Sequence, residues 1–152
     1  MTGTPGPGVA GVGGAAAIDT TIVNSLREIP RVAQMVEDLG AEHKLPADAV
    51  YDVQLALEEI LTNVITYGYP DDQVHHISIR LNVGDGMVTA EVGDDGSAFN
   101  PLEAPWPDLT AGLRERTVGG LGIHFVRQLM DHVEYSRGEG KNRLVMKRRT
   151  GA

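Results

Sequence analysis

Residues 92–101 read Val-Gly-Asp-Asp-Gly-Ser-Ala-Phe-Asn-Pro, and they stand where a run of alternating apolar residues at 88–92 ends. Such alternation is typical of a β-strand with one buried face. A carboxylate at the end of a strand, here Asp94, can accept a hydrogen bond from an exocyclic amine. A glycine two residues later, Gly96, lets a flat ring approach the backbone. Taken alone, the segment favours an ordinary Asp-Gly turn, so its meaning depends on the rest of the chain.

The strand before this stretch has a predicted partner. Apolar residues at positions 77, 79, 81 and 83 alternate with polar ones, and a glycine-rich turn at 84–86 separates them from the next run. Alternation on both sides of such a turn predicts a β-hairpin. A last hairpin is predicted over residues 133–146, around a second glycine-rich turn at 138–140.

One further strand and three helices are predicted. A β-branched stretch at 18–24 predicts the strand. Apolar residues at helical spacing predict the helices, and the first of them begins either at Leu26, after a capping-box spacing, or at Pro30, because proline suits a first turn. Gly40 is either the end of this helix or a weak point in it. The other two helices are predicted at residues 45–67 and 122–131.

Residues 100–118 carry three prolines and a lone tryptophan, Trp106, and show no period, which predicts a loop. Helices and antiparallel hairpins thus come in blocks along the chain. That order predicts an α+β fold: a two-layer sandwich in which a mostly antiparallel sheet carries its helices on one face.

Length and composition indicate one domain. The chain has 152 residues, and its first 17 hold six of the 19 glycines and no charge. We therefore expect residues 1–17 to be a flexible Gly/Ala-rich tail and residues 18–152 to form the folded domain.

The charge balance excludes several classes of partner. A net charge of −8 disfavours direct nucleic-acid binding and a polybasic membrane anchor. The absence of cysteine excludes disulfides and thiolate metal sites, so a cytoplasmic protein is expected. Six of the 13 lysines and arginines lie within residues 137–149, which favours a charged edge strand, with a partner surface as the alternative.

A second chemical signal lies on the predicted helix at 45–67. Glu59 and Asn63 are four residues apart, so a carboxylate and an amide share one helix face, together with Asp52 and Thr66. A helix that packs on a sheet and carries such a pair at its side is able to line a cleft. Polar pairs at this spacing on a solvated face are common, so this signal alone is weak.

A third signal is Gly119-Gly120-Leu121-Gly122, which opens the predicted helix at 122–131. Residues without side chains at a helix N-terminus expose backbone N–H groups, and the helix dipole favours an anion there. This feature would let an acidic protein bind phosphate, although a flexible joint has the same composition. Arg114 and Arg116 in the preceding loop could reach a terminal phosphate.

In this order, these segments resemble the N, G1 and G2 boxes of the Bergerat-fold ATPases, the superfamily of gyrase, histidine kinases and the mismatch-repair ATPase. The chain looks most like the anti-sigma-factor serine kinases of bacterial partner-switching modules. The resemblance covers most of the predicted domain. It is carried by EEILTNVITYGY at 58–69, DDGSAFNP at 94–101 and GGLGI at 119–123.

The resemblance implies a role for each matching residue. Glu59 matches the general base that takes the proton of a protein serine, and Asn63 matches the ligand of the Mg²⁺ on ATP. Asp94 matches the acceptor for the adenine amine, and Gly96 the glycine beside it. The phosphate-binding residues implied in the same way are Gly120, Leu121 and Gly122.

Two departures from the family pattern matter. The family often has a histidine four residues after the asparagine, where this chain has Tyr67. The arginine before the glycine loop is often nearer; in this chain Thr117 and Val118 separate Arg116 from the loop.

The implied function is an ATP-dependent protein serine kinase that binds a sigma factor and phosphorylates an anti-sigma-factor antagonist, a single small domain with a target serine. A homodimer is expected from the resemblance alone. Two alternatives stay open. One is a non-catalytic, nucleotide-dependent anti-sigma or switch protein, and the other is a detached domain that phosphorylates histidine, for which the chain shows no phosphoacceptor helix pair.

Overall fold

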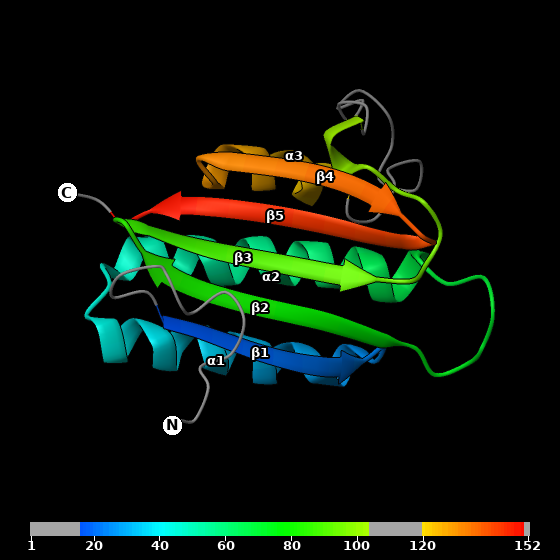
Figure 1. Ribbon diagram of the computed structural model, residues 1–152, viewed down its shortest axis with the longest axis horizontal. Coiled ribbons are helices and arrows are strands. Elements are labelled where there is room, and N and C mark those ends of the chain that lie inside the picture. Colours follow the sequence, from blue (N-terminus) through cyan, green and yellow to red (C-terminus); the bar gives the residue numbers. More distant parts are fainter. Residues whose placement is uncertain (1–15, 104–119, 151–152) are drawn as a thin grey trace.

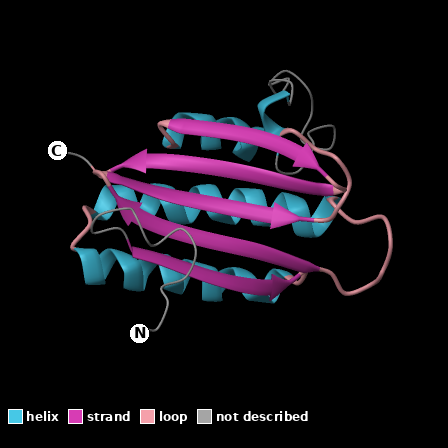
Figure 2. Ribbon diagram, viewed as in Figure 1, coloured by secondary structure: helices cyan, strands magenta, loops and turns pink. Residues whose placement is uncertain are grey.

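The computed structural model describes residues 16–103 and 120–150, which form one sheet with three α-helices (Figures 1 and 2). Two short 3₁₀ turns, η1 and η2, complete the described part. The elements in chain order are β1 (Ala16–Val23), η1 (Leu26–Glu28), α1 (Ile29–His43), α2 (Ala47–Tyr67), β2 (His76–Gly84), β3 (Met87–Asp94), η2 (Pro101–Glu103), α3 (Gly120–Leu129), β4 (His132–Gly138) and β5 (Lys141–Arg149).

The five strands are antiparallel and follow the order β1-β2-β3-β5-β4 across the sheet. The helices lie together behind this sheet in Figure 1, so they cover one face, and no described helix covers the other. The predicted two-layer α+β sandwich is confirmed. None of the helices in the described part of the chain is long and apolar enough to cross a membrane.

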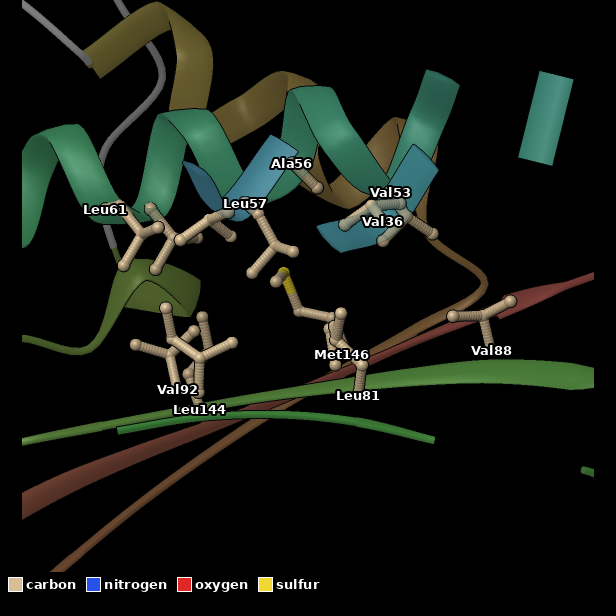
Figure 3. Packing of buried hydrophobic residues seen from close by; sticks show 14 of the residues in the cluster. Val36, Val53, Ala56, Leu57, Leu61, Leu81, Val88, Val92, Leu144 and Met146 are labelled. Carbon is tan, nitrogen blue, oxygen red and sulfur yellow. The ribbon is translucent and has the colours of Figure 1, made fainter. Parts of the chain in front are cut away.

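The core lies between the sheet and the helices. Alternate side chains of β2 and β3 point inward, which is the pattern that predicted their hairpin. Figure 3 shows side chains of α2 and α1 facing those of the sheet. Residues that are buried here include Val36, Val53, Ala56, Leu57, Leu61, Leu81, Val88, Val92, Leu144 and Met146.

Gly40 lies inside α1 and does not end it. A Cβ atom at this position would come 2.5 Å from Cγ2 of Val50, so the absence of a side chain lets α1 approach α2. The helix continues to His43 and ends where Lys44 adopts a left-handed conformation.

Both predicted starts of the first helix exist. Ser25 Oγ accepts a hydrogen bond from the backbone N–H of Arg27 and caps η1, and α1 follows with Pro30 in its first turn. The first strand begins at Ala16, two residues earlier than predicted. Ala16 and Ala17 therefore belong to the sheet and not to the predicted tail, because they continue the pairing with β2.

The basic segment at 137–149 does not form an edge strand as a whole, and that prediction was wrong for most of it. β5 lies between β3 and β4, so of the two strands in this segment β4, which carries Arg137, is the one at an edge of the sheet. Two of the positive charges of β5 are paired with neighbouring carboxylates: Arg143 Nε donates to Glu91 at 2.7 Å and Arg148 Nε donates to Asp52 at 2.9 Å.

Candidate functional site

A cavity opens between α2 and the ends of β3, β4 and β5. It holds about 330 Å³ of empty space, part of it open to solvent, and its walls combine apolar side chains with a few polar groups. This composition suits a flat, largely apolar ring that carries polar edges. The lining residues are Ile60, Asn63, Val64, Val92, Asp94, Phe99, Pro101, Tyr135, Asn142 and Leu144.

Asp94, the last residue of β3, is 8% exposed and lies in this cavity. Its Oδ1 accepts hydrogen bonds from the backbone N–H of Gly96 at 2.8 Å and from the side-chain amide of Asn142 at 2.9 Å. These donors compensate the burial of the carboxylate. A carboxylate accepts up to about four hydrogen bonds, so Asp94 keeps acceptor capacity for a ligand.

Position 96 requires a glycine because its backbone contacts the end of α2. A Cβ atom there would lie 2.5 Å from the carbonyl oxygen of Gly68 and 3.1 Å from Oδ1 of Asp94. The next residue, Ser97, donates its backbone N–H to the same Gly68 oxygen at 2.7 Å. The loop after β3 is therefore fastened to the helix that carries Glu59 and Asn63.

The polar residues on one face of α2 have two different surroundings: some lie at the cavity and others contact the sheet. Asn63 lines the cavity, and its amide nitrogen donates to the carbonyl oxygen of Glu59 at 2.7 Å. That bond uses the NH₂ end of the amide, and the oxygen is the atom able to coordinate a cation. Asp52, by contrast, is paired with Arg148 and serves packing.

Glu59 is half-buried one turn before Asn63, although it is not among the residues that line the cavity. Burial raises the pKa of its carboxyl, and the neighbouring charge of Glu58 adds to this effect. A carboxylate with a raised pKa accepts a proton more readily, as a general base must.

Three residues near Asp94 were not predicted as site residues from the sequence: Asn142, Tyr135 and Arg137. Asn142 is 7% exposed and lies directly opposite Asp94 in the β3–β5 register. Tyr135 and Arg137 of β4 both bond to its side chain. The available signal was an asparagine two residues before Leu144, at an inward position of an alternating strand.

A second cluster lies beyond Asp95 and was also missed. The rings of Tyr69 and His75 stack with centroids 4.1 Å apart, and His75 Nε2 lies 2.8 Å from Asp71 while Nδ1 lies 3.4 Å from Asp95. Burial raises the pKa of Tyr69, and the charges of Asp94 and Asp95 raise it further. His75 lies just before β2, which begins at His76.

Comparison with known proteins identifies the domain. The family described as the histidine kinase-like ATPase domain matches residues 22–148. The chain belongs to this family. The cavity at the end of β3 is therefore a candidate nucleotide site of a histidine kinase-like ATPase domain.

Several curated relatives of this ATPase domain are similar over 61–73% of the chain. The chain is 24% identical to the serine/threonine-protein kinase BtrW of Bordetella bronchiseptica, over 73% of this chain and 78% of that protein. It is 30% identical to the serine-protein kinase RsbW of Bacillus subtilis, over 61% of each. It is 28% identical to an anti-sigma F factor of a Thermoanaerobacter species, over 64% of this chain and 68% of that protein.

A solved structure supports the fold. The RsbU and RsbW domains of a Mycobacterium tuberculosis protein superpose with a TM-score of 0.62 at 18% identity, over 88% of this chain and 32% of that one. Agreement at this identity establishes the shared fold.

The predicted phosphate loop of the ATPase domain is described only in part. Gly120, Leu121 and Gly122 form the first turn of α3, which begins two residues earlier than predicted. The first backbone N–H groups of a helix have no partner within it, so this turn can bind an anion. Gly119, Arg114, Arg116 and Trp106 lie outside the described residues.

The residues present fit a magnesium ion that arrives with a nucleotide. Within residues 16–103 and 120–150, no group of three or more His, Cys, Asp or Glu is arranged to hold a metal. Mg²⁺ on a nucleotide is bound mainly by phosphates and water, with one or two protein oxygens. Asn63 offers one such oxygen at the cavity.

Proposed function

We propose that this chain is an ATP-dependent protein serine kinase and anti-sigma regulatory factor of a bacterial partner-switching module, which phosphorylates an anti-sigma-factor antagonist. The observation that carries the proposal is the placement of Asp94 and Asn63 in one cavity of a histidine kinase-like ATPase domain. The names of the relatives, serine kinases and an anti-sigma F factor, supply the reaction and the regulatory role.

In this proposal the adenine of ATP occupies the cavity, and its amino group donates to Asp94. Gly96 keeps the loop beside the base close to α2. The phosphates extend toward the first turn of α3, where Gly120, Leu121 and Gly122 present backbone N–H groups. The assignment of Arg116 to the terminal phosphate also belongs to the proposal.

Mg²⁺ would be held by the oxygen of Asn63, and when bound it neutralises charge on the phosphates. The hydroxyl oxygen of the partner's serine attacks the γ-phosphorus, and the bond to the β–γ bridging oxygen breaks. Glu59 accepts the hydroxyl proton, and ADP leaves. Because phosphoryl transfer depends mostly on positioning and charge stabilisation, the fastening of the β3 loop to α2 contributes directly.

The proposed partners are a sigma factor and a small single-domain antagonist with a target serine. We propose that the protein acts in the cytoplasm, without direct contact with nucleic acid or membrane. A homodimer is part of the proposal, and the exposed edge strand β1 with the adjacent α1 offers a face for it.

Phosphate transfer from labelled Mg-ATP to candidate single-domain antagonists tests the proposal. The wild-type chain is expected to label a serine, and Glu59→Gln to reduce labelling by about 10²- to 10⁴-fold. The neighbouring, exposed Glu58 provides a matched control, Glu58→Gln, which keeps transfer within a few-fold. Equal transfer by wild type and Glu59→Gln would contradict the assigned base.

One observation favours a second candidate, a switch protein in which nucleotide sets conformation without transfer. Several relatives are named as anti-sigma F factors, not as kinases, and Glu59 is absent from the lining of the cavity. Binding of Mg-ATP without turnover, together with partner affinity that depends on the bound nucleotide, would select this candidate.

A further inference from the structure

The side-chain amide of Asn142 has a fixed orientation in the core. Its nitrogen donates to Oδ1 of Asp94 at 2.9 Å and to the carbonyl oxygen of Ser97 at 2.9 Å. A carboxylate and a carbonyl only accept, so the NH₂ end of the amide must face them. The buried position of Asn142, opposite Asp94 across β3 and β5, leaves little room for another arrangement.

The other end of the same amide is held from β4, which lies beside β5 at the edge of the sheet (Figure 1). The hydroxyl of Tyr135 and the guanidinium of Arg137, the latter at 2.9 Å, both donate to Oδ1 of Asn142. A guanidinium can only donate, which again requires the amide oxygen at this end. The same nitrogen of Arg137 donates to the carbonyl oxygen of Gly96 at 3.1 Å.

These contacts form one connected network from the edge strand to the cavity. Tyr135 and Arg137 hold Asn142, and Asn142 holds Asp94, whose Oδ1 also accepts from the N–H of Gly96. Asp94 is thereby fixed as a pure acceptor whose remaining capacity is available to a ligand. Tyr135 and Asn142 also line the cavity themselves, whereas Arg137 is not among the lining residues.

A fixed acceptor discriminates between ring edges. A base with an amino group at this edge donates to Asp94. A base with a carbonyl oxygen there places two acceptors together and leaves a buried polar group without a partner, which costs binding energy. The stiffness of the network decides how large this difference is, because a mobile Asp94 could turn away or admit a bridging water.

We infer that Tyr135, Arg137 and Asn142 form a positioning network that sets the base selectivity of the nucleotide site, in favour of 6-aminopurines over 6-oxopurines. The inference rests on the proposed function only in that a nucleotide occupies the cavity. None of the three residues belongs to the motif segments at 58–69, 94–101 and 119–123, and Tyr135 and Arg137 act on the base through Asn142 and Asp94.

Calorimetric titration of the full chain with Mg-ADP and with Mg-IDP tests the network, because these nucleotides differ in the amino or oxo group at position 6. Wild type is expected to bind ADP more tightly by at least about tenfold, the value of one hydrogen bond to a charged group. Arg137→Met and Tyr135→Phe are expected to lower the ADP-to-IDP affinity ratio by about 3- to 30-fold, and Arg137→Lys to retain more of it than Arg137→Met.

Arg143→Met is the matched control, because Arg143 lies on the same hairpin and bonds to Glu91, away from Asp94. It is expected to leave the ratio unchanged. Arg137 is exposed and Tyr135→Phe keeps the ring, so both variants are expected to melt cooperatively.

The outcomes separate the two claims. Selective wild-type binding with an unchanged ratio in Arg137→Met and Tyr135→Phe overturns the network but leaves the proposed function. Loss of ADP and IDP affinity in equal proportion shows a purely structural role and overturns it as well. A wild-type chain that binds neither nucleotide overturns the proposed function and the network together.

Discussion

Gly96 and Gly68 are in direct contact, so that a Cβ atom on Gly96 would lie 2.5 Å from the carbonyl oxygen of Gly68. Gly68 follows the last residue of α2, and Gly96 lies two residues after Asp94. This contact, with the hydrogen bond from Ser97 to Gly68, couples the loop beside the base to the helix that carries Asn63.

The Gly96–Gly68 contact predicts that Gly96→Ala is destabilising. The backbone oxygen cannot move aside as a flexible side chain would, so the free energy of unfolding is expected to fall by about 1–3 kcal/mol. The affinity for Mg-ADP is expected to fall as well, because the loop must shift away from α2. Chemical denaturation and calorimetry measure the two effects.

Gly138→Ala is the control for this substitution. An added Cβ at Gly138 would meet no atom of the described residues within 4 Å, so stability and affinity should stay close to wild type. If the two alanine variants behave alike, the contact with Gly68 does not matter.

The raised pKa of Glu59 predicts the pH dependence of phosphate transfer. Burial and the charge of Glu58 hold this pKa above 4.5, and only the deprotonated carboxylate can accept the serine proton. The rate should therefore rise with pH through a pKa above 4.5 and then level off. A pH–rate profile should show this acidic limb in wild type and in Glu58→Gln, and a profile that keeps the same limb in Glu59→Gln would exclude Glu59 as its source.

Arg148 joins α2 to β5 through Asp52, and both side chains are mostly buried. Arg148→Met leaves the Asp52 carboxylate without this donor, and the free energy of unfolding is expected to fall by about 1–3 kcal/mol. Arg143→Met removes an exposed pair with Glu91 and is expected to cost at most about 1 kcal/mol. Urea denaturation compares the two, and equal losses would refute the structural role of the Arg148 pair.

His75 predicts a stability that depends on pH. The pKa of His75 is raised above 6.5 in the folded chain, mainly by its hydrogen bond to Asp71. The negative charges of Asp71 and Asp95 raise this pKa further. A group whose pKa is raised by folding stabilises the protein below its unfolded pKa, and this contribution is lost as pH rises through the folded pKa.

The melting temperature of wild type should therefore exceed that of His75→Gln most at about pH 6 and less at about pH 8, above the ordinary pKa of histidine. Tyr69, which stacks on His75, faces the same cluster and remains neutral in this range, since its own pKa is raised. A constant difference between pH 6 and pH 8 would show that the charge of His75 does not contribute.

Much of the fold could be predicted because its signals are local. The β2–β3 hairpin was predicted from alternation around one glycine-rich turn, and α2 from its apolar stripe and the proline before it. The position of β5 between β3 and β4 could not be predicted, because strand order depends on pairing between residues far apart in sequence. The basic residues of β5 looked like edge protection, although Arg143 pairs with Glu91 of the neighbouring β3 and Arg148 pairs with Asp52 of α2.

The site shows the same division. Asp94 and Gly96 stand in a recognisable segment, and Asn63 has a helical spacing to Glu59 that the sequence displays. Asn142 completes the environment of Asp94 only through the register of two strands that lie 48 residues apart at this point. No local sequence pattern predicts that register, so the pairing of Asn142 with Asp94 could be identified only in the structure.

The central claim is that an adenine nucleotide binds against Asp94. Calorimetric titration with Mg-ADP, of wild type and of Asp94→Asn, tests it most directly. The account predicts saturable binding of one nucleotide per chain by wild type and at least about tenfold weaker binding by Asp94→Asn, whose amide replaces an acceptor by a donor. No binding by wild type, or equal binding by both proteins, would contradict it.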